Sequence, residues 1–171
     1  MTRTLVAGIG NVLMSDDAIG PYCVRQLVAQ YSFPSGVAVE DLGTPGLDLA
    51  LHLSDADVVI LIDALHGAPG GKIGVFDFGE LSGSGAGVRL DTHAPALAES
   101  IQVARLTSDR PRDVTLIGLG GENFDHGTAL TPAVGALMPA LIATVLKELA
   151  TRGIAAVLRD APSAPDVWWV Q

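Results

Sequence analysis

Apolar segments of strand length alternate along the chain with segments whose apolar residues recur at helical spacing. Residues 4–9 are nearly all apolar, as expected for a central strand that is covered on both faces. Residues 37–42, 58–62 and 114–119 predict further strands. Residues 75–78 predict a strand at an edge of the sheet. The alternation is typical of an α/β fold, a three-layer α/β/α sandwich with a mostly parallel central sheet of about five strands.

Helices are predicted between these strands, at residues 21–31, 47–53, 95–106 and 132–151. Pro21 fits only the first turn of its helix, because a proline ring is not tolerated further inside. The carboxylates of Asp16 and Asp17, just before Pro21, therefore lie either in the loop that leaves the first strand or at the cap of the first helix.

The length and the composition fit a single domain spanning residues 1–171. The chain has 171 residues, of which 49% are hydrophobic and 17% charged, and this suffices for a sizeable core. Residues 81–87, rich in Gly and Ser, are predicted to form a loop within the domain. Residues 161–171 are assigned to a C-terminal tail without clear periodicity, in which Trp168 and Trp169 are expected to be exposed and to offer a docking surface or a subunit contact.

The net charge of −9 argues against binding to nucleic acids or anionic membranes, which proteins contact mainly through Lys and Arg. Most of the acidic excess lies before Gly85 and suggests a cationic partner. Cys23 is the only cysteine, and the N-terminus does not resemble a secretory signal, so a cytoplasmic location is expected. The uncharged stretch 127–146 is interrupted by Pro132 and Pro139, so no membrane insertion is expected.

Acidic residues recur where the predicted strands end. The C-terminal ends of parallel strands meet at one edge of the sheet, and ligands bind in the crevice beyond them. Carboxylates gathered there repel one another unless a cation, a proton or a positive substrate group intervenes. Two carboxylates and an imidazole that leave coordination positions open suit a divalent transition metal. The residues at this edge are Asp16 and Asp17 after the first strand, Asp41 after the second, Asp63 after the third, and Asp91 and His93 before a helix.

Each of these residues also has a purely structural interpretation. The position of Asp16 or Asp17 before the first predicted helix is equally consistent with the role of its N-cap residue. Asp63 is also consistent with a turn cap, and His93 with a solvated loop residue. His66, three residues after Asp63, is interpreted as a solvated loop histidine. Their joint occurrence at strand ends, rather than any one of them, supports a site.

Several familiar site motifs are absent from the sequence. Gly8-Ile-Gly10 begins like a dinucleotide-binding fingerprint, but Leu13 stands where the third glycine belongs, and two acids follow where a pyrophosphate would bind. The chain has no Gly-x-Ser-x-Gly elbow, no Walker lysine, no His-Glu-x-x-His and no Cys-x-x-Cys. We therefore expect no organic cofactor.

The segment from Gly8 to Gly20, Gly-Ile-Gly-Asn-Val-Leu-Met-Ser-Asp-Asp-Ala-Ile-Gly, resembles the opening signature of the hydrogenase maturation endopeptidases, which process the large subunit of [NiFe]-hydrogenases. The likeness continues in the order of that family and covers residues 4–150. It includes residues 41–46, residues 62–64, the region of His93 and residues 127–134.

The resemblance implies a sheet with helices on both sides, and an endopeptidase that removes a C-terminal extension from the large-subunit precursor once nickel has been inserted. It implies that Asp17, Asp63 and His93 are the catalytic and nickel-contacting residues, with nickel carried by the precursor as the recognition signal. The family often has Glu where this chain has Asp17, whose carboxylate reaches one methylene less far. Whether a carboxylate activates water or the metal polarises the peptide carbonyl stays open.

Four further residues are expected to border the substrate cleft: Asp16, Asp41, Gly43 and Thr44. The turn at residues 43–46 lies at the same edge of the sheet, but it is equally consistent with a turn that contacts no substrate. Two other functions fit the same residues. One is a metal-binding chaperone that recognises the hydrogenase precursor without cutting it. The other is an α/β protein that binds a small molecule in a compact apolar pocket.

Overall fold

The computed structural model describes residues 2–77 and 93–170, with only the backbone for residues 47 and 93–95. The predicted loop at 81–87 and Asp91 lie outside the described residues. The elements are β1 (Thr4–Ile9), η1 (Ser15–Ala18), α1 (Ile19–Gln30), β2 (Tyr31–Ser32), β3 (Val37–Gly43), η2 (Gly46–Asp48), α2 (Leu49–Ser54), β4 (Val58–Leu65), β5 (Ile73–Asp77), α4 (His93–Ser108), β6 (Asp113–Gly120), α5 (Pro132–Thr151) and β7 (Val157–Leu158).

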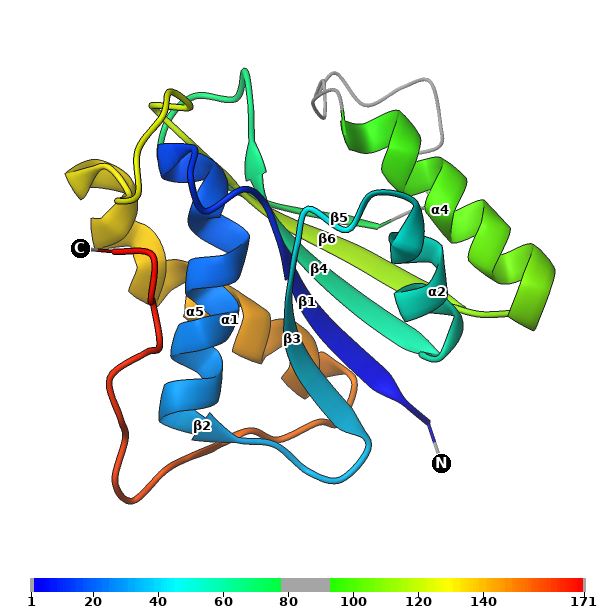
Figure 1. Ribbon diagram of the computed structural model, residues 1–171. Helices are drawn as coiled ribbons and strands as arrows, with labels where there is room; N and C mark the ends of the chain where they lie inside the picture. The colour runs from blue at the N-terminus through cyan, green and yellow to red at the C-terminus, as the bar shows by residue number, and fades with distance from the viewer. Residues whose placement is uncertain (1, 78–92, 171) are drawn as a thin grey trace.

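Five strands form a central sheet in the order β3-β1-β4-β6-β5. The first four are parallel, and β5 runs antiparallel at the edge next to β6. Helices α1 and α5 cover one face of the sheet, and α2 and α4 cover the other (Figure 1). The predicted three-layer α/β/α architecture is therefore confirmed.

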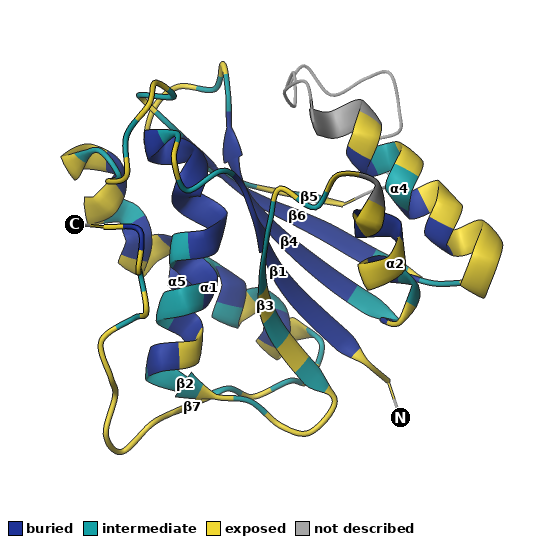
Figure 2. Ribbon diagram, viewed as in Figure 1, coloured by how far each residue is buried: buried dark blue, intermediate teal, exposed yellow. Residues whose placement is uncertain are grey.

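The alternation of side chains along the strands divides the core into two halves. Val6 and Ile62 point toward α1 and α5, whereas Leu5 and Leu61 point toward α2 and α4. Both faces of β1, β4 and β6 are therefore buried (Figure 2), which explains why these strands are almost continuously apolar in the sequence. Asp63 continues the set that points toward α2 and α4, because it follows Leu61 by two residues.

The glycines of the first motif allow η1 and α1 to approach the end of β1 very closely. Gly10 has a φ of +140°, and a Cβ there would overlap the backbone oxygen of Asp17. A Cβ at Gly20 would overlap the backbone oxygens of Ile9 and Ile62, which lie on two neighbouring strands. Only glycine fits such contacts. The motif therefore places the turn that carries Asp17 directly on the edge of the sheet.

The C-terminal segment packs against the domain through one of its two tryptophans. Trp168 is exposed, with 67% of its surface accessible, but Trp169 is only 3% exposed, so the expectation that both are exposed is wrong for Trp169. The Trp169 ring packs edge-on against Tyr22 of α1, with the ring centroids 5.3 Å apart. Trp169 is thus buried by an aromatic ring of α1 that is distant in sequence, although the tail itself has no helical or strand periodicity.

Helix α5 is long and apolar enough to cross a membrane by length and composition alone. Its Val134, Leu141 and Val145 are buried against the sheet and α1. The opposite face of α5 is exposed (Figure 2). The apolar composition of α5 is thus accounted for in part by its role as a core helix on this face of the sheet.

Candidate functional site

The strand register brings two of the predicted acids to the same edge of the sheet. In β1, Gly8 pairs with Asp41 of β3 on one side and with Ile62 of β4 on the other. Asp63 pairs with Gly118 of β6. Strand β4 continues to Leu65, three residues beyond the predicted end, so Asp63 is held within the sheet rather than in a loop.

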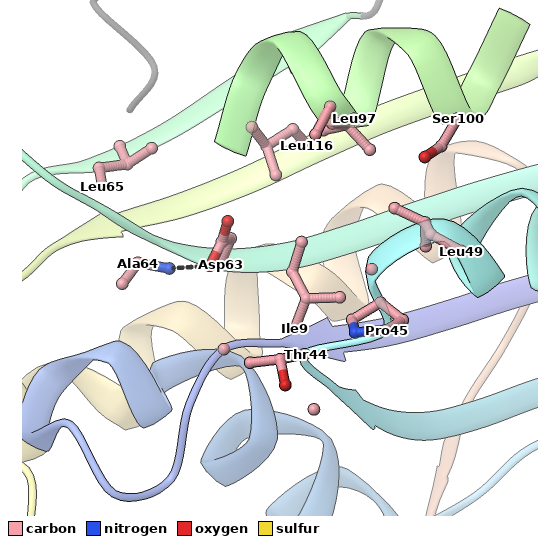
Figure 3. A pocket seen from close by; sticks show the side chains of 14 residues that line it. Ile9, Thr44, Pro45, Leu49, Asp63, Ala64, Leu65, Leu97, Ser100 and Leu116 are labelled. Atoms are coloured by element: carbon pink, nitrogen blue, oxygen red, sulfur yellow. Dashed lines mark hydrogen bonds between the residues drawn. The ribbon is translucent and has the colours of Figure 1, made fainter. Parts of the chain in front are cut away.

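Asp63 is only 8% exposed and points into a cavity between β4 and the layer of α2 and α4 (Figure 3). Its Oδ1 accepts a hydrogen bond of 2.8 Å from the backbone N–H of Ala64. The carboxylate is thus held by the strand that carries it, and it faces the cavity.

Asp17 lies in η1, and the backbone of Asn11 holds its carboxylate. The N–H of Asn11 donates to Oδ2 of Asp17 at 2.7 Å, and Asp17 is 6% exposed. Neither η1 nor α1 has a side-chain cap, so the alternative that Asp16 or Asp17 is an N-cap of the first helix is not realised. The Asp17 carboxylate is therefore oriented by the strand-to-helix turn and not by the helix that follows.

His66 is the main residue at this edge that the sequence analysis underestimated. Its Nε2 lies 3.1 Å from Oδ1 of Asp17. An ionised carboxylate can only accept, so this contact requires the proton on Nε2. The imidazole is stacked on the ring of Phe124, with centroids 3.6 Å apart and planes at 21°. No short motif joins Asp17, His66 and Phe124, and only the fold brings them together.

Asp16 has a different environment from Asp17. It is fully buried, and its carboxylate accepts four hydrogen bonds of 2.7–3.0 Å. The donors are the backbone N–H groups of Glu122, Asn123 and Thr131 and the hydroxyl of Thr131. Thr131 is the N-cap residue of α5, where a negative charge is favourable. Asp16 therefore ties η1 to the β6–α5 connection and does not line the cavity beside Asp63.

Asp41 also lies away from that cavity. Its Oδ2 accepts hydrogen bonds of 3.1 Å from both Nε and Nη2 of Arg25, and its Oδ1 accepts one of 3.0 Å from the N–H of Gly43. Arg25 also contacts Asp166 of the C-terminal segment at 3.5 Å. Of the four residues expected at the cleft, Gly43 and Thr44 line the cavity with Asp63, whereas Asp16 and Asp41 do not.

His93 is the first residue of α4 and is one of the residues of which the structure describes only the backbone. Among the residues with described side chains, no group of three His, Cys, Asp or Glu residues is close enough to hold a metal ion. The predicted set of Asp17, Asp63 and His93 is therefore neither confirmed nor contradicted by the structure.

Cys23 is unsuited to nucleophilic catalysis. It is fully buried in the core between the sheet and α1, and this burial raises the pKa of its thiol strongly. Since the thiolate is the reactive form, a thiol in this environment is inert. Among the described residues, the carboxylates at the strand edge are the groups best placed for hydrolytic chemistry.

Comparisons with known proteins agree on one family. The hydrogenase maturation protease family matches residues 21–148 of the chain. The chain is 32% identical over 162 residues to the hydrogenase 2 maturation protease of Escherichia coli K12, covering 93% of this chain and 98% of that protein. It is 33% identical over 158 residues to the hydrogenase expression/formation protein HoxM of Azotobacter vinelandii, covering 91% of this chain and 76% of that protein.

The three-dimensional fold is also similar to solved structures of this family. The solved structure of the hydrogenase maturating endopeptidase HybD from E. coli superposes with a TM-score of 0.81 at 29% sequence identity, covering 92% of this chain and 98% of that chain. The sequence and fold comparisons together identify the protein as a hydrolase of the endopeptidase class. The chain belongs to the hydrogenase maturation protease family.

Proposed function

We propose that this endopeptidase removes the C-terminal extension of a [NiFe]-hydrogenase large-subunit precursor after nickel has been inserted, in the cytoplasm. In this proposal the nickel belongs to the substrate, and Asp17, Asp63 and His93 contact it. The observation that carries the proposal is the placement of Asp17 and Asp63 at the C-terminal edge of β1 and β4, each oriented by a backbone N–H group.

The donor set fits a transition metal held partly by another protein. Two carboxylates and one imidazole supply fewer ligands than a closed structural site needs, so positions remain for ligands that the precursor brings. The metal would supply positive charge next to the scissile peptide. On the protein, Asp63 faces the cavity that would receive the peptide, and His66 holds the Asp17 carboxylate in one orientation. Loading of nickel would then be sensed through the same groups that position the peptide.

The function is tested by incubating the protein with the nickel-loaded and the nickel-free precursor and weighing the products by mass spectrometry. We expect the nickel-loaded precursor to be shortened at its C-terminus and the nickel-free precursor to stay intact. Binding without shortening would support the non-cleaving chaperone instead. Equal cleavage of both forms would leave the endopeptidase activity in place but contradict recognition through nickel.

The contact between His66 and Asp17 predicts a specific defect. His66→Phe keeps an aromatic ring to stack on Phe124 but removes the nitrogen that contacts Asp17. Residues that orient metal-binding carboxylates contribute about 10–100-fold to affinity or activity, so we expect a loss of that size in cleavage rate. Single-turnover assays with nickel-loaded precursor, together with the melting temperature, measure the effect. His126→Phe, at an exposed position, is the matched control, and equal rates for the two variants would exclude this role.

A further inference from the structure

The cavity beside Asp63 has a volume of about 240 Å³ and lies between the strand ends and the α2 and α4 layer (Figure 3). Leu97 and Ser100 of α4 form one wall, and Ile9 and Pro45 lie opposite. Dry apolar cavities of about 150 Å³ admit a molecule as large as benzene. The space is therefore sufficient for one large aliphatic or aromatic side chain.

The cavity wall is almost entirely apolar. Its apolar side chains come from segments between residues 9 and 116 and include Ile9, Pro45, Leu49, Leu65, Leu97 and Leu116. Among the lining residues whose side chains are described, Asp63 is the charged group, and the polar side chains beside it are the hydroxyl groups of Thr44 and Ser100. An apolar group placed here would leave water and pack against apolar side chains, whereas an anionic group would lose its hydration next to the carboxylate of Asp63.

The turn at residues 43–46 forms one side of the cavity, and two of its four residues are glycines. Gly43 and Gly46 both have a φ of +55°, and a Cβ at either position would meet no atom within 4 Å. The open space at this turn gives an extended peptide room to approach the strand ends next to Asp63. The cavity is thus continuous with the edge at which cleavage is proposed.

A compact apolar pocket is also what a protein that binds a small molecule would have. Two observations favour a peptide side chain here. Asp63, the carboxylate proposed to act on the substrate, is part of the wall, and the chain belongs to a family of endopeptidases. A small molecule occupying this space would block the residue that the reaction needs.

We propose that this cavity is a specificity pocket that takes one large apolar side chain of the precursor, from a residue close to the scissile bond. This inference rests on the proposed function, because it assigns the cavity to the same substrate. When the side chain of the precursor is buried beside Asp63, the peptide backbone next to it is held at the C-terminal edge of β1 and β4. The endopeptidase therefore selects its cleavage position by the nickel on one side and by an apolar anchor on the other.

The cleavage test uses nickel-loaded precursors in which each residue near the scissile bond is replaced singly by alanine or aspartate. We expect one position at which alanine lowers kcat/KM by about 10–200-fold, the range that hydrophobic pockets provide, and aspartate lowers it further. Ser100→Phe fills the cavity, so this variant should cleave the natural precursor more slowly. Replacing the anchoring residue of the precursor by alanine should then lower kcat/KM less for Ser100→Phe than for the unchanged protein. Gln102→Phe, on the exposed side of α4, should behave like the unchanged protein. A uniform response at all positions would overturn the proposal.

A second measurement does not depend on cleavage. N-acetyl-leucine-amide is titrated into the ¹⁵N-labelled full chain while amide shifts are followed by nuclear magnetic resonance. We expect shifts at Gly43, Thr44 and Ser100, weaker shifts with N-acetyl-aspartate-amide, and none in Ser100→Phe. If the precursor is not cut but the probe binds, the proposed function fails and the pocket stands. If the precursor is cut but the probe does not shift these amides, the pocket is wrong.

Discussion

Replacing Asp63 with asparagine is expected to lower cleavage of the nickel-loaded precursor by about 10²–10⁴-fold, the contribution typical of a positioned catalytic group. Asparagine has nearly the shape of aspartate, and its side-chain oxygen can still accept the hydrogen bond from the N–H of Ala64. The substitution therefore removes the negative charge at the cavity and keeps the local backbone. A single-turnover assay read by mass spectrometry measures the loss, and the melting temperature reports whether the fold is retained.

The matched control is Asp55→Asn, at an exposed position after α2, which should cleave at the unchanged rate. The same assay applies to Asp17→Asn and His93→Gln, for which we expect losses of the same order. Full activity in all three variants would remove the assignment of Asp17, Asp63 and His93. A loss confined to one of them would reduce the assignment to that residue.

Replacing Asp16 with alanine is expected to destabilise the fold rather than to change the chemistry. The substitution leaves four donors without their acceptor in a buried position, and each such loss costs about 1–3 kcal/mol. Because the four bonds share one carboxylate, their costs do not simply add, and we expect a loss of about 4 kcal/mol in the free energy of unfolding. Urea denaturation of the full chain measures this loss.

Asp125→Ala is the control for Asp16→Ala, since Asp125 is an exposed acid in the same β6–α5 connection. Exposed substitutions of this kind usually change stability by at most about 0.5 kcal/mol. An unfolding free energy for Asp16→Ala within that range would contradict the structural role of Asp16. A normal stability combined with lost cleavage would move Asp16 into the catalytic site beside Asp17.

The contrast between Asp16 and Asp17 shows where sequence reasoning stops. The two residues are adjacent, chemically identical and part of one motif, and both were candidates for the site or for a helix cap. Their side chains leave η1 in different directions, so one meets the N–H groups before α5 and the other meets Asn11 and His66. The partners of Asp16 are more than 100 residues away in the chain, and no local pattern predicts that encounter.

The environments of His66 and Trp169 also depend on contacts that the sequence does not predict. His66 is not part of any periodic pattern in the sequence. Its role follows from the ring of Phe124 in the β6–α5 connection and the carboxylate of Asp17 in η1. Trp169 is in a segment without periodicity, yet Tyr22 of α1 buries it. In both cases the deciding contact joins residues far apart in sequence, and it depends on packing that a linear pattern does not encode.

The sequence by itself determined the architecture, because burial on both faces demands continuous apolar strands, and burial on one face demands helical periodicity. It also determined that acids gather at one edge, since parallel strands end together there. Only the tertiary structure decided which of these acids faces the cavity and which accept hydrogen bonds from other parts of the chain. It also decided that an apolar pocket adjoins Asp63. Those outcomes depend on side-chain direction and on distant partners, which exist only once the layers have packed.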